Sequence, residues 1–190
     1  MMFSRILTSK QIENLRIDEK DKYSNWWFSN SVITKSSGRT LKIIFIPANQ
    51  LTINKLRKIN GWNFNWNREF QIKSRNVEVL TLKKNNSIIL GLISYEILED
   101  HLHVHLVESS PENIGKNKKY IGIGSNLFAY ACWISKNNGF EGNISFFSKT
   151  RLIKHYQLTL CAINLGKGKM IIHEYQSEFL IDKYFSDEAK

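Results

Sequence analysis

The sequence predicts one α+β domain over residues 1–190, with a mixed and mostly antiparallel central sheet. Strand-like runs separated by polar turns follow one another through the first half of the chain. In the second half, amphipathic helix patterns alternate with strands, so a strand–helix–strand crossover should make part of the sheet parallel. Hydrophobic residues make up 42% of the chain, which is typical of a protein with a full core.

In the first half, residues 1–40 are predicted to be an N-terminal extension packed on the domain, with a short helix over 9–17. Lys35–Arg39 reads as a loop, and a helix is expected over 52–59, ended by Gly61. The strands of this half are predicted at 41–47, 77–82, 87–97 and 101–107, and the last three form an antiparallel meander.

The pattern changes after a polar loop over 111–118. A helix is predicted over 125–138, because apolar residues recur on one face and Gly139 follows as a stop signal. The remaining elements are predicted as a strand over 142–147, a helix over 149–160, a strand over 169–174 and a last helix over 178–185.

The net charge of +10 is unevenly distributed. Residues 1–95 hold 16 Lys and Arg against 6 Asp and Glu, whereas residues 96–190 hold 11 of each kind. A basic surface for an acidic partner, such as nucleic acid or an acidic protein, is one interpretation. The other is compositional, because lysines scattered over a surface are usually only solvated.

Composition also limits the class of protein. The two cysteines, Cys132 and Cys161, lack the spacing of a metal site, so we interpret both as reduced thiols of a cytoplasmic protein and expect no metal. No apolar run approaches the roughly 18 residues that a membrane span needs, so no membrane association is expected.

The most informative motif is the run Lys119-Tyr120-Ile121-Gly122-Ile123-Gly124-Ser125, which leads into the helix predicted from Ser125. Glycine lets backbone N–H groups approach a ligand closely, and a helix start adds unpaired donors and partial positive charge. Together these features predict a site for a pyrophosphate. A dinucleotide fingerprint would need a third glycine where Leu127 stands, and a P-loop would need a Gly-Lys pair that is absent.

The order of meander, basic residue, Gly-x-Gly, helix, strand and a helix bearing Tyr156 resembles the GNAT acyltransferase superfamily. The resemblance covers about residues 41–175 and is specific over 102–162. Three features depart from the family pattern. Lys119 stands where Arg or Gln is usual, Cys161 stands where Gly is usual, and the loop over 109–118 is longer.

The resemblance implies a cofactor, acetyl-CoA or another acyl-CoA, held in a splayed cleft of the sheet. Backbone N–H groups from Ile121 to Ser125 would hold the pyrophosphate, with Lys116 and Lys118 near the remaining phosphate charge. Val107 would pair its backbone with the pantetheine arm. The cofactor-binding residues predicted in this way are Val107, Lys119, Tyr120, Ile121, Gly122, Ile123, Gly124, Ser125 and Lys149.

Two residues are the candidates for proton transfer in direct attack of an amine on the thioester. Tyr156 would protonate the leaving thiolate, although a tyrosine packed at a sheet edge is the structural alternative. Glu108 would be the base for the amine, although it could also be a turn carboxylate beside Ser109. Glu96 is the reserve base.

Two further patterns have a structural and a functional interpretation. His101, His103 and His105 alternate along one strand face, which indicates a half-exposed face more than a metal site, with one histidine able to help move protons. Trp62, Phe64 and Trp66 also alternate. Core packing is the default for them, and lining an acceptor pocket or stacking bases is the alternative.

The resemblance implies an acyl-CoA-dependent N-acetyltransferase acting on an amine-bearing acceptor, as a monomer or homodimer. The basic first half favours an acidic acceptor or one carried on RNA, while protein lysines, N-termini and small amines stay open. The alternative is a non-catalytic module on the same fold that binds CoA, nucleic acid or protein. Thiol release from acetyl-CoA with a panel of amines would discriminate between the two.

Overall fold

The computed structural model describes residues 29–185, which form two compact units. The N-terminal unit comprises residues 29–94 and 106–124, and the C-terminal unit comprises 95–105 and 125–185. The helix predicted over 9–17 lies outside the described residues, as does most of the predicted N-terminal extension. Within residues 29–185, no helix has both the length and the apolar character needed to cross a membrane.

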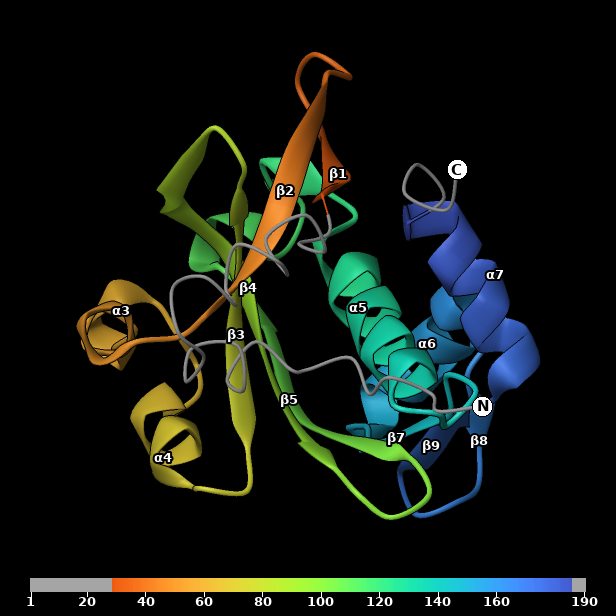
Figure 1. The fold of residues 1–190 in the computed structure, drawn as a ribbon. Coiled ribbons are helices and arrows are strands. Elements are labelled where there is room, and N and C mark those ends of the chain that lie inside the picture. The colour runs from red at the N-terminus through yellow and green to blue at the C-terminus, as the bar shows by residue number, and fades with distance from the viewer. Residues whose placement is uncertain (1–28, 186–190) are drawn as a thin grey trace, which may run out of the picture. The chain divides into compact units, whose positions relative to one another are not determined.

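Strands of the N-terminal unit follow the order β6-β1-β2-β3-β4-β5 (Figure 1). Neighbouring strands pair antiparallel from β6 to β3, with Ile33 opposite Ile121 and Phe45 opposite Leu80. Their bounds are β1 Ser29–Thr34, β2 Thr40–Pro47, β3 Asn76–Leu82, β4 Asn85–Ile97, β5 Leu102–Ser109 and β6 Tyr120–Ile121. The adjacency of β3, β4 and β5 confirms the strand order of the predicted meander, and β1 and β6 are additions that the sequence patterns did not indicate.

Strands of the C-terminal unit follow the order β4-β5-β7-β9-β8, to which β4 and β5 contribute their residues 95–97 and 102–105. The added strands are β7 Ile144–Phe147, β8 Ile163–Asn164 and β9 Lys169–Ile172. β5 pairs with β7 in parallel, and helix α5, Ile123–Asn137, connects the two. This pair confirms the predicted crossover in a mixed sheet. Leu102–Val104 of β5 pair with Ile144–Phe146 of β7, while β5 itself continues to Ser109.

Two short helices, α3 Gln50–Ile53 and α4 Trp66–Gln71, belong to the N-terminal unit and contact each other. The helix predicted over 52–59 is wrong: α3 begins earlier, where Asn49 accepts a hydrogen bond from the N–H of Thr52, and the chain turns at Asn54. A 3-10 turn, Lys58–Asn60, follows and ends at Gly61, whose φ of 86° is left-handed. β-Branched residues and asparagine favour a helix weakly, which explains the early break.

Helices α5, α6 Ile153–Leu160 and α7 Glu174–Phe185 belong to the C-terminal unit. α5 starts at Ile123, not at Ser125 as predicted, and the segment predicted as one helix over 149–160 is a 3-10 turn, Thr150–Leu152, followed by α6. α7 starts four residues earlier than predicted, with Glu174 in its first turn, where a carboxylate favours the helix dipole.

Each unit has its own core. In the N-terminal unit, Trp62 and Trp66 are buried against Val79 and Leu92, so these two tryptophans are core residues, while Phe64 is only partly buried. In the C-terminal unit, the predicted apolar face of α5 is buried, and the ring of Phe128 lies 4.8 Å from that of Phe146.

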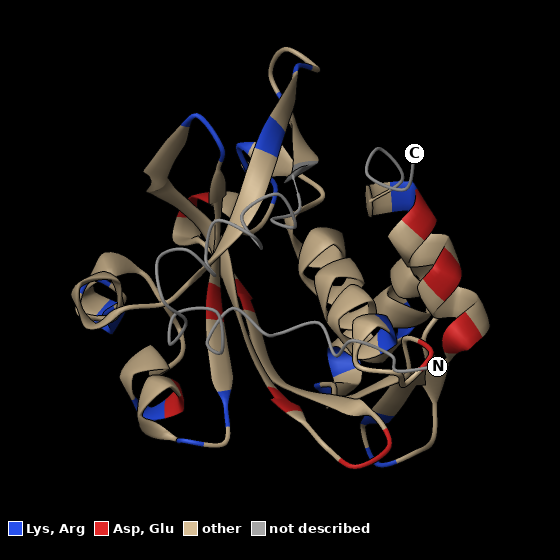
Figure 2. Ribbon diagram, in the orientation of Figure 1, with Lys and Arg blue, Asp and Glu red and all other residues tan. Residues whose placement is uncertain are grey.

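Helix α7 carries a stripe of acidic side chains along one face. α7 carries Glu174, Glu178 and Asp182 at four-residue intervals, visible as red bands in Figure 2. Glu178 accepts a hydrogen bond from Lys136 of α5 over 3.2 Å. Side chains four residues apart share one helix face, so this face of α7 is acidic.

Candidate functional site

The Gly-x-Gly segment joins the short strand β6 to helix α5. Tyr120 and Ile121 lie in β6, paired with Thr34 and Ile33 of β1. Gly122 then adopts a φ of 97°, a left-handed conformation that favours glycine, and Ile123 is the first residue of α5. The first N–H groups of a helix have no partner within it. The turn at Gly122 therefore starts a 15-residue helix whose N-terminal donors belong to the predicted pyrophosphate segment.

Gly124 differs from Gly122 in what its position requires. It lies in the first turn of α5, and its φ is not among the positive values. A Cβ added there would meet no atom within 4 Å outside the helix's own backbone. Neither conformation nor packing therefore requires glycine, which makes a helix less stable than alanine by about 1 kcal/mol. Its effect is to leave the backbone of the first turn uncovered, where a ligand can approach.

Lys119 precedes this segment, and its side chain pairs with a glutamate of the preceding loop. Its Nζ lies 3.1 Å from Oε2 of Glu112, and this hydrogen bond raises the pKa of the Lys119 ammonium. The backbone of the loop is held as well: the Lys119 carbonyl accepts from the N–H of Lys35, and Oδ1 of Asn113 accepts from the N–H of Tyr120. Because the Lys119–Glu112 pair is exposed, it is weak and can be exchanged for another anion.

Glu108 lies near the end of β5 with only 5% of its surface exposed. Its Oε1 accepts hydrogen bonds from the backbone N–H and the side-chain amide of Asn63, and its Oε2 accepts one from Nε1 of Trp66 over 2.7 Å. Three of about four lone-pair positions of the carboxylate are thus used. Glu108 therefore holds the 63–66 segment in place through these hydrogen bonds. The sequence patterns did not predict this contact.

Tyr156 lies on α6 in an aromatic cluster of the C-terminal unit. The rings of Phe128 and Phe146 each lie 5.3 Å from its ring, both edge-on. Burial raises the pKa of the Tyr156 hydroxyl, because the phenolate would lose hydration. The hydroxyl therefore stays protonated at neutral pH, as a proton donor must.

Lys149 and Val107 occupy positions of different kinds. Lys149 is exposed and precedes the 3-10 turn Thr150–Leu152, with its carbonyl accepting from the N–H of Leu152. Val107 is half-buried on β5, beyond Val104, which pairs with Phe146 of β7. A strand that continues past its paired residues has backbone groups available for an extended ligand.

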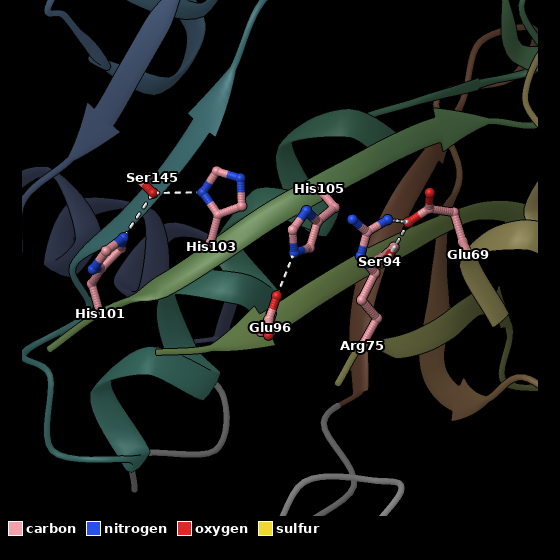
Figure 3. Close-up of polar contacts among 8 residues, drawn as sticks. All are labelled: Glu69, Arg75, Ser94, Glu96, His101, His103, His105 and Ser145. Carbon is pink, nitrogen blue, oxygen red and sulfur yellow. Dashed lines mark hydrogen bonds and ion pairs between the residues drawn. The ribbon is translucent and has the colours of Figure 1, made fainter. Parts of the chain in front are cut away.

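A chain of hydrogen bonds runs along the histidines of β5 (Figure 3). Nδ1 of His101 lies 2.6 Å from the Asp100 carboxylate, and its Nε2 lies 2.8 Å from Oγ of Ser145. Nδ1 of His103 lies 2.7 Å from the same hydroxyl oxygen. The bond to His101 lowers the pKa of Asp100. Oγ of Ser145 thus lies between the two imidazole rings, and the tautomer of each ring decides whether it donates to this hydroxyl or accepts from it.

The third histidine pairs with the reserve base. Nε2 of His105 lies 2.9 Å from Oε2 of Glu96, and its ring meets that of His103 edge-on at 4.6 Å (Figure 3). Both side chains of this pair are partly exposed. Residues 29–185 hold no group of three His, Cys, Asp or Glu arranged to bind a metal ion.

A further polar cluster was not indicated by the sequence patterns. Oε2 of Glu69 accepts hydrogen bonds from Nη1 of Arg75, over 2.6 Å, and from the hydroxyl of Ser94 (Figure 3). The cluster joins α4 to β4 within the N-terminal unit. Arg75 and Ser94 lie 6 and 25 residues from Glu69 in the chain. A contact over 25 residues leaves no local pattern in the sequence from which it could be predicted.

Comparison with known proteins identifies the fold. No family model matches the chain, and no curated protein matches it in sequence. Among solved structures, a crystal structure of AtaTR bound with AcCoA has a TM-score of 0.51 and 12% identity, over 73% of this chain and 98% of that chain. A chimera of spermidine N-acetyltransferase SpeG from Vibrio cholerae and hSSAT has a TM-score of 0.50 and 15% identity, over 72% and 98%. The chain thus has the fold of GNAT acetyltransferases, as its resemblance implied.

Proposed function

We propose that the chain is an N-acetyltransferase that moves an acetyl group from acetyl-CoA to an amine. The observation that carries the proposal is Gly124, a glycine in the first turn of α5 where the fold has no need of one. Such a position lets the phosphates of a cofactor approach the backbone N–H groups at a helix start. The fold shared with an AcCoA-bound structure supports acetyl-CoA as that cofactor.

In this proposal the cofactor is held by backbone groups and lysines. The N–H groups of Ile123 to Ser125 bind the pyrophosphate, and Lys119 exchanges Glu112 for phosphate charge. Tyr120 and Ile121 position these donors through their pairing with β1. The backbone of Val107 pairs with the pantetheine arm, and Lys149 is a further contact to the cofactor.

The chemistry is direct transfer. The amine nitrogen attacks the thioester carbon, the C–S bond breaks, and the thiolate takes a proton from the hydroxyl of Tyr156. The amine loses its proton to Glu108, whose Oε2 has one lone pair beyond its bond to Trp66. The Glu96–His105 pair is the reserve for this step, because it is partly exposed and Glu108 is held by three hydrogen bonds.

The acceptor is an amine, and the basic charge of residues 1–95 favours one that carries negative charge or is attached to RNA. The two free cysteines, one buried and one exposed, fit a reducing compartment, so we place the protein in the cytoplasm. A monomer or a homodimer is compatible with this function.

Thiol release from acetyl-CoA with a panel of amines tests the proposal, with the Tyr156→Phe chain as the matched variant. Acceptor-dependent release that this variant loses is expected. Mass spectrometry of cell extract incubated with labelled acetyl-CoA would then show whether the label reaches protein, RNA or small molecules. Thermal stabilisation by CoA without turnover on any acceptor would contradict the enzyme and support the non-catalytic module.

A further inference from the structure

A pocket of about 400 Å³ lies in the N-terminal unit, at helices α3 and α4 and the chain that connects them. Its apolar lining consists of Ile53, Leu56 and Phe64. Ile53 and Leu56 are buried in the core of this unit, and Phe64 packs against that core. The volume is within the range of sites that hold small organic ligands. The pocket therefore combines a volume of ligand size with an apolar floor.

Three asparagines form much of the polar lining, and all three use their side-chain oxygen within the protein. Nε2 of Gln50 donates to Oδ1 of Asn54, over 3.0 Å, and to Oδ1 of Asn67, over 3.3 Å. Oδ1 of Asn65 accepts from the N–H of Arg68 at the start of α4. An amide side chain has one acceptor oxygen and two N–H donors. The groups that these asparagines retain for a ligand are therefore chiefly donors.

The remaining polar lining is cationic. Arg57 donates through Nε to the carbonyl of Asn54 over 2.9 Å, which orients the guanidinium and leaves its Nη groups for a ligand. Lys58 lies next to it in the lining. The lining contains no Asp or Glu, and the chain from 54 to 65, which joins α3 to α4, contains none either (Figure 2). The pocket thus offers hydrogen-bond donors and positive charge over an apolar floor.

We propose that this pocket binds an organic oxyanion, a phosphate or carboxylate whose apolar or aromatic part rests on Ile53, Leu56 and Phe64. Planar guanidinium groups and amide N–H groups bind such anions through charge-assisted hydrogen bonds. An uncharged ligand would not neutralise the charges of Arg57 and Lys58. A cationic ligand would be repelled by them and would find no carboxylate in the lining. The pocket is distinct from the proposed catalytic residues, because neither Glu108 nor Tyr156 belongs to its lining.

Titration of the full chain with phenyl phosphate, phenylacetate and phenol tests the proposal, without acetyl-CoA and at constant ionic strength. The side-chain amide NMR signals of Asn54 and Asn67 report on the pocket itself, so binding of a phosphate elsewhere does not count. We expect one or both anions to shift these signals and phenol to leave them unchanged. The stronger anion tells whether the site prefers phosphate or carboxylate.

Two variants complete the test. Arg57→Gln should weaken the anion at least tenfold, and Arg68→Gln, which removes the same charge from α4 outside the pocket lining, should have little effect. Unchanged amide signals with both anions would overturn the proposal, as would equal weakening by the two variants, which indicates general attraction to a basic surface. Because acetyl-CoA takes no part, loss of this site and failure of the proposed enzyme activity are separate results.

Discussion

Trp66 donates its indole N–H to Oε2 of Glu108 over 2.7 Å, and both side chains are buried. The two residues are 42 positions apart, one on α4 and the other on β5. Asn63 donates two more hydrogen bonds to the same carboxylate. Glu108 thus holds in place the chain that leads into α4. A buried carboxylate requires such partners, because an unpaired charge is strongly destabilising there.

Trp66→Phe should therefore lower the free energy of unfolding by about 2–4 kcal/mol, since it removes a hydrogen bond to a buried charge and leaves a cavity. Trp62→Phe is the matched control, because Trp62 is buried in the same core, whereas the donors to Glu108 among the described residues are Asn63 and Trp66. Urea unfolding of the two variants measures the difference. Equal losses would mean that the bond to Glu108 contributes nothing measurable.

Gly124→Ala should separate cofactor binding from folding. We expect the free energy of unfolding to stay the same or rise by about 1 kcal/mol, because alanine favours the helix and meets open space. Affinity for acetyl-CoA, measured by calorimetry, should fall at least tenfold, because the methyl group obstructs the phosphates. Lys136→Ala, near the other end of α5, should bind normally. Full affinity in Gly124→Ala would remove the main support for the proposed site.

Tyr156→Phe should lower kcat by about 100-fold or more, the range of general acid catalysis, with affinity for acetyl-CoA little changed. Phenylalanine keeps the ring contacts with Phe128 and Phe146 and removes only the proton donor. Steady-state kinetics with an identified acceptor measure the effect. Tyr175→Phe, on an 82% exposed tyrosine of α7, is the control. An unchanged kcat would assign Tyr156 to packing alone.

Cys132 should make the protein less stable in alkali. Burial raises the pKa of its thiol to about 12, against an ordinary value of 9.0. The folded state keeps the thiol neutral while the unfolded state releases its proton, so this contribution is complete below pH 9 and is lost as the pH rises toward 12. The loss is about 1.4 kcal/mol per pH unit in that interval.

Urea unfolding between pH 8 and about 10.5 measures this loss. Cys132→Ala should reduce the alkaline slope, whereas Cys161→Ala should retain it, because Cys161 is exposed. The raised pKa of Tyr156 adds a slope of the same sign, so the comparison is made between the two cysteine variants at each pH. Identical slopes in both variants would contradict the effect of burial on Cys132.

Cys161→Gly should raise the free energy of unfolding by about 0.5–1 kcal/mol. Cys161 ends α6 with a φ of 53°, where a side chain is strained by about 1–2 kcal/mol. Glycine relieves this strain and loses part of the gain to its greater freedom in the unfolded chain. Thermal unfolding measures the change, with Cys161→Ala as the control that keeps a Cβ. A less stable glycine variant would contradict the assigned strain.

Local patterns in the sequence predicted much of the fold. The strands at 77–82 and 87–97 and the buried face of α5 were visible as runs and periodicities, because each depends on neighbours in the chain. Helix bounds were less accurate. The helix predicted over 52–59 failed because Asn54 and the β-branched residues around it break α3 after Ile53. The six-residue α4 was too short to give a period.

The candidate site was predicted unevenly for the same reason. Gly122 and Gly124 were found from a motif seven residues long, but their different requirements, a left-handed φ and an open Cβ position, are properties of the folded backbone. The alternation of His101, His103 and His105 was visible, whereas their bonds to Ser145 and Glu96 depend on strand pairing. The donor-lined pocket at α3 and α4 had no sequence signal, because it depends on which asparagine oxygens Gln50 occupies.

By itself the sequence determined the strands of the predicted meander, the glycine turn before α5 and the uneven charge, since these follow from residue type and short-range spacing. Only the tertiary structure decided that Glu108 accepts hydrogen bonds from Trp66 and Asn63, that Tyr156 packs against aromatic rings, and that Gln50 donates to the side-chain oxygens of Asn54 and Asn67. The physical reason is that hydrogen bonding and burial join residues distant in the chain, and no local pattern specifies which partners meet.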